Sequence, residues 1–209
     1  REHLFCHLPL PSSACKMARI AGEVVDVQRP IGIEKQYPMY ARPMSDIFSN
    51  DRFVVHEDLM AQSKLIDWGR ELGPLVFLSQ TWLSFSHPDP DGVKHAQVKQ
   101  LAKSILADRL RVSTHWFTEM VYGARNLNPE SMRELAEHGY YWIDVEGVPQ
   151  RNPTLKAMAC NSIPWYVQES THFWVLVPPW KHKECGHIVD VRTWGSRGWC
   201  RAERTFNYL

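Results

Sequence analysis

The 209-residue sequence lacks an apolar run long enough to cross a membrane. Its longest, Phe173 to Trp180, is interrupted by prolines, whereas a membrane helix needs about 20 apolar residues. The five cysteines are odd in number and scattered, which is typical of a reducing intracellular compartment, cytoplasmic or within an organelle. The net charge of +1 is too small for a dedicated nucleic-acid binder. We therefore expect no membrane span and no nucleic-acid partner.

Motifs for common cofactors and metals are also missing. The sequence contains no Walker loop and no Gly-x-Gly-x-x-Gly, which argues against phosphoryl transfer and dinucleotide redox chemistry. His182, Glu184, Cys185 and His187 are close together, but their spacing fits no standard structural zinc site. We expect no metal and no bound cofactor.

The N-terminal quarter of the chain has many prolines and little periodicity. We predict an irregular arm over residues 1–55, with a short strand at Gly22 to Val27, and one α/β domain over residues 56–209. The chain starts at Arg1, so we expect a processed protein or a fragment. Residues 1–20 lack the apolar core of a secretory signal, while a trimmed organellar presequence stays open.

Three short apolar runs bounded by helix breakers predict strands buried on both faces: Leu75 to Ser79, Tyr140 to Val145 and Phe173 to Val177. Before and between these runs, apolar residues recur at the spacing of a helix. The expected helices cover Glu57 to Leu72, the stretch around Val98 to Leu106, Trp116 to Ala124, Pro129 to Ala136, and Asn152 to Val167 with a kink at Pro164. This alternation predicts a parallel sheet flanked by helices, with extra helices between the first two strands.

Polar residues follow the predicted strands. Ser79 and Gln80 end the first strand, Asp144 and Glu146 are at the end of the second, and the loop from Pro178 to Ser196 follows the third. Ligands of parallel sheets bind beyond the carboxyl ends of the strands. Six basic residues between Lys181 and Arg204 would attract a phosphate-bearing molecule or form an ordinary solvated face.

The last helix places a carboxylate among apolar residues. A helix capped by Ser196 has Trp199, Glu203 and Phe206 at i, i+4 and i+7, so Glu203 is predicted to point inward. A buried acid must be paired, raised in pKa or used chemically. From spacing alone, a Glu held by a neighbouring Arg or backbone amide is the alternative to a functional acid.

Four ordered segments resemble the successive blocks of heterokaryon-incompatibility-type domains, which are similar to Toll/interleukin-receptor (TIR) domains. They are Leu75 to Trp82 (LVFLSQTW), Trp142 to Gln150 (WIDVEGVPQ), the Met158 to Tyr166 helix, and Arg197 to Glu203 (RGWCRAE). The resemblance covers about residues 74 to 206 and implies a flavodoxin-like fold.

The resemblance also implies a site and an activity. Glu203 corresponds to the glutamate that is catalytic in TIR domains that cleave NAD, which makes the chain a candidate NAD glycohydrolase with a nucleotide as substrate. There the acid stabilises an oxocarbenium-like ribosyl centre or engages the ribose hydroxyls. Ser79, Gln80, Trp82, Asp144 and Arg197 are the expected substrate-binding residues, and Trp199 is expected to form an aromatic wall beside the acid.

Departures from the family pattern keep a second function open. Gln80 stands where incompatibility-type domains often have histidine, and Gly147-Val148 replaces Cys-Ile. The TIR pattern continues to further strands, whereas this sequence stops at Leu209, so we expect a short sheet or a truncated chain. The alternative is a non-catalytic module for self-association or for a larger assembly, in which Glu203 serves structure.

Overall fold

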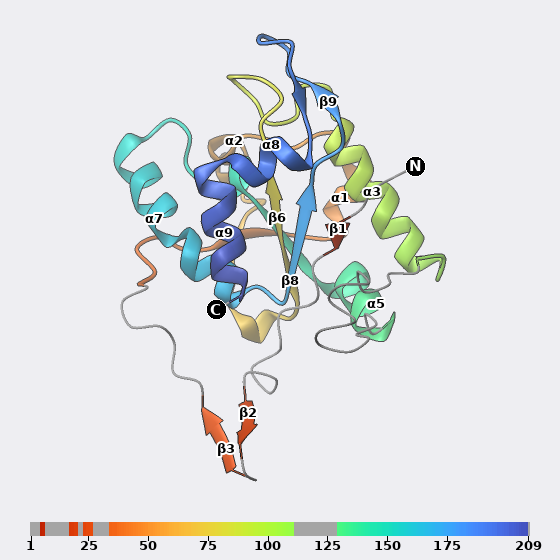
Figure 1. The fold of residues 1–209 in the computed structure, drawn as a ribbon, viewed down its shortest axis with the longest axis vertical. Coiled ribbons are helices and arrows are strands. Elements are labelled where there is room, and N and C mark those ends of the chain that lie inside the picture. The colour runs from red at the N-terminus through yellow and green to blue at the C-terminus, as the bar shows by residue number, and fades with distance from the viewer. Residues whose placement is uncertain (1–4, 7–16, 21–22, 27–33, 111–128, 209) are drawn as a thin grey trace.

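A six-stranded mixed sheet is the centre of the fold (Figure 1). The computed structural model describes residues 5–6, 17–20, 23–26, 34–110 and 129–208. The strands of this sheet are β1 (Phe5–Cys6), β4 (Tyr40–Pro43), β5 (Ile66–Asp67), β6 (Leu75–Gln80), β7 (Tyr140–Ile143) and β8 (His172–Leu176). Their order is β1-β8-β6-β7-β4-β5.

The three predicted strands are neighbours and run parallel. β6 pairs with β7 on one side, with Phe77 opposite Trp142, and with β8 on the other, with Phe77 opposite Phe173. β1, β4 and β5 extend the sheet as antiparallel strands at its two edges. The predicted α/β class is therefore confirmed, with a mixed sheet that is parallel in its centre. Two hairpins lie outside this sheet, β2 (Met17–Ile20) with β3 (Glu23–Asp26), and β9 (Trp180–Lys181) with β10 (Ile188–Val189).

Helices cover both faces of the sheet. Their bounds are α1 (Asp46–Ser49), α2 (His56–Ala61), the 3-10 turn η1 (Arg70–Leu72), α3 (Val93–Leu106), α5 (Pro129–His138), α6 (Asp144–Gly147), α7 (Pro153–Glu169), α8 (Val191–Ser196) and α9 (Gly198–Tyr208). Apolar residues of α3 and α5 pack on one face with Val76 and Leu78. Residues of α7, α8 and α9 pack on the other with Leu75 and Phe77. We call these the α3 face and the α7 face.

The alternation along β6 separates the side chains of its last two residues. Strand side chains point alternately to the two faces, so Ser79 follows Phe77 toward the α7 face and Gln80 follows Leu78 toward the α3 face. All six residues of β6 are buried. Neighbouring residues at the end of one strand can therefore reach helices on opposite sides of the sheet.

The chain leaves β6 and β7 in opposite directions. After β6 it continues to α3 and α5 on the α3 face, and after β7 it passes through α6 to α7 on the α7 face. In open α/β sheets a crevice forms between the carboxyl ends of two such strands. The hairpin β9–β10 and helix α8 lie beyond the same ends of the strands (Figure 1). This edge of the sheet is where side chains of different segments meet.

Part of the predicted N-terminal arm belongs to the sheet and the core. The short strand expected at Gly22 to Val27 matches β3. Residues 40–49, expected to be irregular, form β4 and α1, and Met39, Met44 and Phe53 are buried in the core. Arg42, in the middle of β4, is buried because Glu146 and Asp46 pair with its guanidinium. Because β4 is short and contains a charged residue, its sequence has no apolar pattern that predicts a strand.

The single helix predicted over Glu57 to Leu72 is wrong. α2 ends at Ala61, and Ser63 adopts a left-handed backbone with φ of 52° that a helix cannot continue through. The chain then pairs with β4 as β5, and the backbone N–H of Trp68 donates to the carbonyl of Met39 at 2.9 Å. Trp68 is buried because of this strand pairing. Its helical spacing from the apolar residues before it therefore does not reflect a helix.

The predicted cap of the last helix is also wrong. Ser196 is the final residue of α8, and α9 begins at Gly198. α8 has its own N-cap, because the carboxylate of Asp190 accepts from the backbone of Thr193 at 3.0 Å while the Thr193 hydroxyl accepts from the backbone of Asp190 at 2.7 Å. The loop expected from Pro178 to Ser196 therefore contains a capped helix.

Other predicted helices are present. α3 buries Val98, Leu101 and Ile105, and α5 begins at Pro129. α7 begins after Asn152, whose side chain accepts from the Leu155 backbone at 3.1 Å, and it contains Pro164, where the kink stays a prediction. The helix predicted at Trp116 to Ala124 lies outside the described residues. Among the helices that are described, none combines the length and apolar composition that crossing a bilayer requires.

Candidate functional site

Ser79 and Glu203 meet at the carboxyl edge of the sheet. The hydroxyl of Ser79, on the α7 face, donates to Oε2 of Glu203 on α9. The same hydroxyl accepts from the indole Nε1–H of Trp194 on α8 at 2.9 Å. The indole N–H can only donate, so it occupies one lone pair of the Ser79 oxygen and leaves the hydroxyl proton to donate to the Glu203 carboxylate. One serine at the end of β6 thus fixes the orientation of an acid 124 positions later.

Asp144 is held between β6 and α6 by three donors. Its Oδ1 accepts from Gln80 Nε2 and from the backbone N–H of Val145, each at 2.8 Å. Its Oδ2 accepts from the indole Nε1–H of Trp82 at 2.6 Å. Asp144 is the first residue of α6, directly after β7. The structure therefore brings Gln80, Trp82 and Asp144 together at the carboxyl ends of β6 and β7.

A buried lysine lies behind this group. Lys94 on α3 is 1% exposed, and its ammonium donates to Oε1 of Gln80 at 3.1 Å and to the carbonyl of Thr81. Burial lowers the pKa of Lys94 to about 8, against the opposing charges of Asp144 and Asp89. With the Gln80 oxygen engaged by Lys94, its amide N–H is left to face Asp144. The lysine, the glutamine and the aspartate form one continuous chain of hydrogen bonds.

Burial raises the pKa of Glu203 to about 8, and the Asp144 carboxylate adds to this rise. The hydrogen bond from Ser79 and the charge of Arg197 act in the opposite direction. A raised pKa of this size is the mark of a carboxyl group that is either structural or poised for acid–base work near neutral pH. Glu203 is partly exposed, so solvent still reaches this residue.

The inward face of α9 differs from the predicted one by one residue. Trp199 is 54% exposed, whereas Cys200 is buried and its thiol lies 3.7 Å from the carbonyl of Gln80. Phe206 packs against the core of the α7 face as expected. The expectation of an inward Trp199 is wrong, because Glu203 is both i+3 from Cys200 and i+4 from Trp199 and the spacing fits either stripe. A role for Trp199 as an aromatic wall remains a prediction, as does substrate binding by the exposed Arg197.

Two residues of the site were missed by the sequence analysis. Trp194 lies four residues after Asp190, and the Asp190-x-x-Thr193 spacing is a capping signal that could have predicted its helix. Lys94 precedes Val98 by four positions and Leu101 by seven, so it occupies the apolar stripe of α3. That is the same signal that singled out Glu203.

A cavity of about 310 Å³ is present near this edge, and none of Ser79, Gln80, Asp144 and Glu203 lines it. In the described part of the chain, no group of three His, Cys, Asp or Glu side chains could hold a metal ion. Within the His182 to His187 segment, the ring of His182 stacks on His187 with centroids 5.3 Å apart.

Comparisons of the chain with models of protein families, with curated proteins and with solved structures found no match.

Proposed function

We propose that this protein is a TIR-like, incompatibility-type domain that cleaves the N-glycosidic bond of NAD or a related nucleotide, with Glu203 as the essential acid. The observation that carries the proposal is the pairing of Ser79 and Glu203 next to Asp144 at the carboxyl ends of parallel strands. The proposal is supported by the closeness of positions that the family resemblance names to the strand ends where parallel sheets bind ligands.

The chemistry needs one well-placed carboxylate. Nicotinamide in NAD is bound to the ribose through a positively charged ring nitrogen, so breaking the C–N bond returns the bonding electrons to that nitrogen and releases neutral nicotinamide. The ribosyl carbon then carries positive charge, which a carboxylate stabilises until water adds and gives up a proton. Glu203 is the group assigned to this role.

Ser79 and Trp194 keep the acid in position. Their hydrogen bonds restrict the rotation of the Glu203 carboxyl group, and preorganised charge of this kind costs no rearrangement during the reaction. Asp144, with three donors of its own, is a second acceptor for ribose hydroxyls at the same edge. The two carboxyl groups are thus held by separate sets of donors.

The raised pKa gives the reaction a defined pH dependence. With a pKa of about 8, Glu203 is mostly protonated at neutral pH in the free protein and cannot stabilise a cation well. A bound nicotinamide ring brings positive charge that favours the ionised form. Activity is expected to rise with pH toward and through 8.

Release of nicotinamide from NAD tests the proposal. Purified protein is incubated with NAD at several protein concentrations, and nicotinamide is measured by chromatography. Glu203→Gln should lower kcat at least about 100-fold, because it removes the charge that stabilises the transition state. Glu134→Gln, on the exposed surface of α5, is the matched control and should keep full activity. Absence of release at every concentration, or equal rates for wild type and Glu203→Gln, would overturn the proposal.

A non-catalytic assembly module is the second candidate. Large apolar side chains are exposed on the segments around this edge: Phe85 after β6, Trp180 and Ile188 on the β9–β10 hairpin, Val191 on α8 and Trp199 on α9. Exposed apolar side chains of this kind mark protein contacts when they form a continuous patch. Concentration-dependent association in sedimentation experiments, lost in Trp199→Ser, together with no cleavage of NAD, would favour this function.

A further inference from the structure

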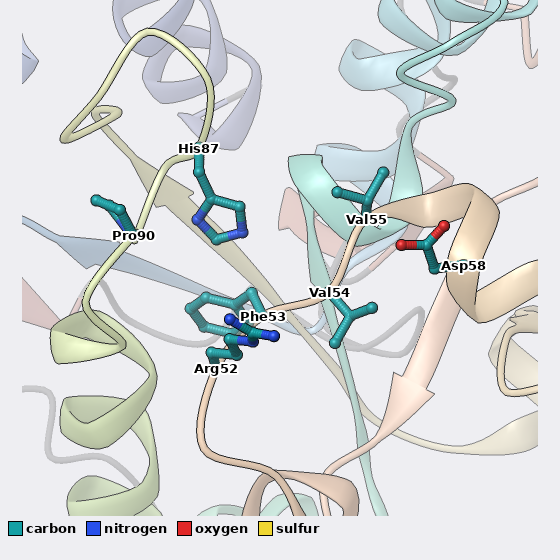
Figure 2. A pocket seen from close by; sticks show the side chains of 7 residues that line it. All are labelled: Arg52, Phe53, Val54, Val55, Asp58, His87 and Pro90. Carbon is teal, nitrogen blue, oxygen red and sulfur yellow. The ribbon is translucent and has the colours of Figure 1, made fainter.

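The cavity of about 310 Å³ lies between two segments that are far apart in the sequence. Its lining residues are Arg52, Phe53, Val54, Val55, Asp58, His87 and Pro90. Figure 2 shows the His87 ring, on the loop after β6, pointing across the cavity toward Arg52 and Phe53 on the opposite segment. The volume is at the lower end of the range for small-molecule sites.

The wall of the cavity that is formed by residues 52–58 is anchored to the fold. On one side the backbone N–H of Val54 donates to the buried carboxyl group of Glu146 on α6 at 2.9 Å. Phe53 packs edge to face on His95 of α3, with ring centroids 5.1 Å apart. The two walls approach closely at Gly92, where a β-carbon would lie only 2.6 Å from the carbonyl oxygen of Asp51. The cavity is therefore a built feature of the fold.

Two of the residues that line the cavity, His87 and Arg52, offer hydrogen-bond donors. His87 Nδ1 accepts from the backbone N–H of Asp89 at 3.0 Å, so the proton of the neutral ring is on Nε2, the nitrogen left for a ligand. Arg52 is exposed, and among the described residues no ion pair engages its guanidinium. Asp58, the acid in the lining, pairs with Arg151 at 2.8 Å. The lining thus contains one cation, Arg52, and one acid, Asp58, whose charge Arg151 offsets from outside the lining, with Phe53, Val54, Val55 and Pro90 as apolar walls.

The cavity lies between two segments that are attached to the strand ends where the topology predicts a crevice. His87 and Pro90 are on the loop that leaves β6. The opposite wall is fixed to α6, which begins at Asp144 directly after β7, through Val54 and through His56, whose Nδ1 lies 2.8 Å from the Glu146 carbonyl. One wall of the cavity is thus connected to β6 and the other to the segment after β7, the two strands from which the chain leaves in opposite directions. Gln80, Trp82 and Asp144 stand at the same pair of strand ends.

We propose that this cavity is a binding site for a mononucleotide unit, with the phosphate on Arg52 and His87 and the ring system among Phe53, Val54, Val55 and Pro90. A guanidinium and an N–H donor that face each other across a mostly apolar space match a phosphomonoester that carries a flat ring. The inference rests on the proposed function in one respect, since it assigns the cavity to the half of the dinucleotide that carries no nicotinamide.

Binding of adenosine monophosphate to the intact protein tests the inference. The probe, adenosine and inorganic phosphate are each titrated at low ionic strength, and dissociation constants are measured by calorimetry. Two-dimensional NMR locates the perturbed residues. We expect the monophosphate to bind at least about tenfold more tightly than adenosine, because charge-assisted hydrogen bonds to phosphate add to ring contacts. The largest shifts are expected at His87 and Val54.

Two arginine variants make the test specific. Arg52→Gln should remove the tenfold preference for the monophosphate, whereas Arg133→Gln, an exposed arginine on α5, should keep it. Equal binding of the monophosphate and adenosine, an unchanged preference in Arg52→Gln, or shifts centred on Ser79 and Glu203 would each overturn the inference.

The outcome is separable from that of the proposed function. Arg52-dependent binding of the monophosphate in a protein that does not cleave NAD removes the proposed activity and supports the nucleotide site. Cleavage of NAD without such binding supports the activity and removes the site.

Discussion

At the residue scale, the site depends on two opposite charges placed in equivalent positions. Glu203 and Lys94 each lie within the apolar stripe of a helix, on opposite faces of the same sheet. Each reaches a residue at the end of β6, Glu203 through Ser79 and Lys94 through Gln80. Burial moves both pKa values toward neutrality, to about 8 in each case. Two titrating groups of opposite sign therefore flank one strand end.

Replacing Glu203 should stabilise the protein at alkaline pH. The folded-state pKa of Glu203 lies above its ordinary value of 4.5, so the folded state binds more protons than the unfolded chain between these two values. The contribution of Glu203 to the free energy of unfolding therefore falls as pH rises from about 4.5 to about 8.

Glu203→Gln lacks this titration. Its free energy of unfolding relative to wild type should increase by about 1 to 2 kcal/mol between pH 5 and pH 9, a figure reduced for partial exposure to solvent. Denaturant unfolding at both pH values measures the difference. If Glu203→Gln loses as much stability relative to wild type at pH 9 as at pH 5, or more, Glu203 is a structural anchor.

At the element scale, short capped elements position the site, and some of them were predictable. The strands at 75–80, 140–143 and 172–176 were recognised because their apolar runs end at breakers. The inward position of Glu203 could be predicted even though the stripe was assigned to Trp199 and not to Cys200, because Glu203 is one helical turn from both residues. β4 was missed because burial of Arg42 depends on Glu146, a contact across 104 positions that no local pattern encodes.

Gly147 lets α6, the helix that begins at Asp144, pack closely against Trp142. A β-carbon at Gly147 would lie 2.2 Å from the indole nitrogen of Trp142, while a β-carbon at Gly195 on α8 would contact nothing within 4 Å. Gly147→Ala should lower the free energy of unfolding by about 1 to 3 kcal/mol through overpacking. Gly195→Ala, the matched control, should leave it unchanged or raise it slightly, since alanine favours helix. Chemical denaturation of both variants checks this, and equal stabilities would contradict the packing described at α6.

At the scale of the whole molecule, the sheet edge gathers distant parts of the chain. Segments from residues 52–58, 79–94, 144–150 and 190–203 meet around the carboxyl ends of β6 and β7. The parallel order of three strands could be predicted from their alternation with helices. Which segment of the N-terminal part would close the edge could not, because that depends on a buried ion pair between Arg42 and Glu146 with a separation of 3.3 Å.

Residues 34–55, which include β4, should be required for folding. A chain starting at residue 56 loses β4 and leaves Glu146 buried without Arg42, and breaking a buried ion pair costs about 3 to 5 kcal/mol. A chain starting at Glu34 keeps β4 and should unfold cooperatively, whereas the shorter chain should not. Thermal unfolding followed by circular dichroism distinguishes them. Cooperative unfolding of residues 56–209 alone would show that the segment before residue 56 is dispensable.

The pH dependence of NAD cleavage tests the central claim most directly. If Glu203 stabilises the ribosyl cation as a carboxylate, kcat/KM for nicotinamide release should rise with pH and level off above an apparent pKa of about 8. Ser79→Ala removes the hydrogen bond that lowers this pKa, so its profile should shift to higher pH while Glu203→Gln stays inactive throughout. A rate that does not change between pH 6 and about pH 9.5, or a Ser79→Ala profile that coincides with wild type, would contradict the assignment of Glu203 as the acting acid.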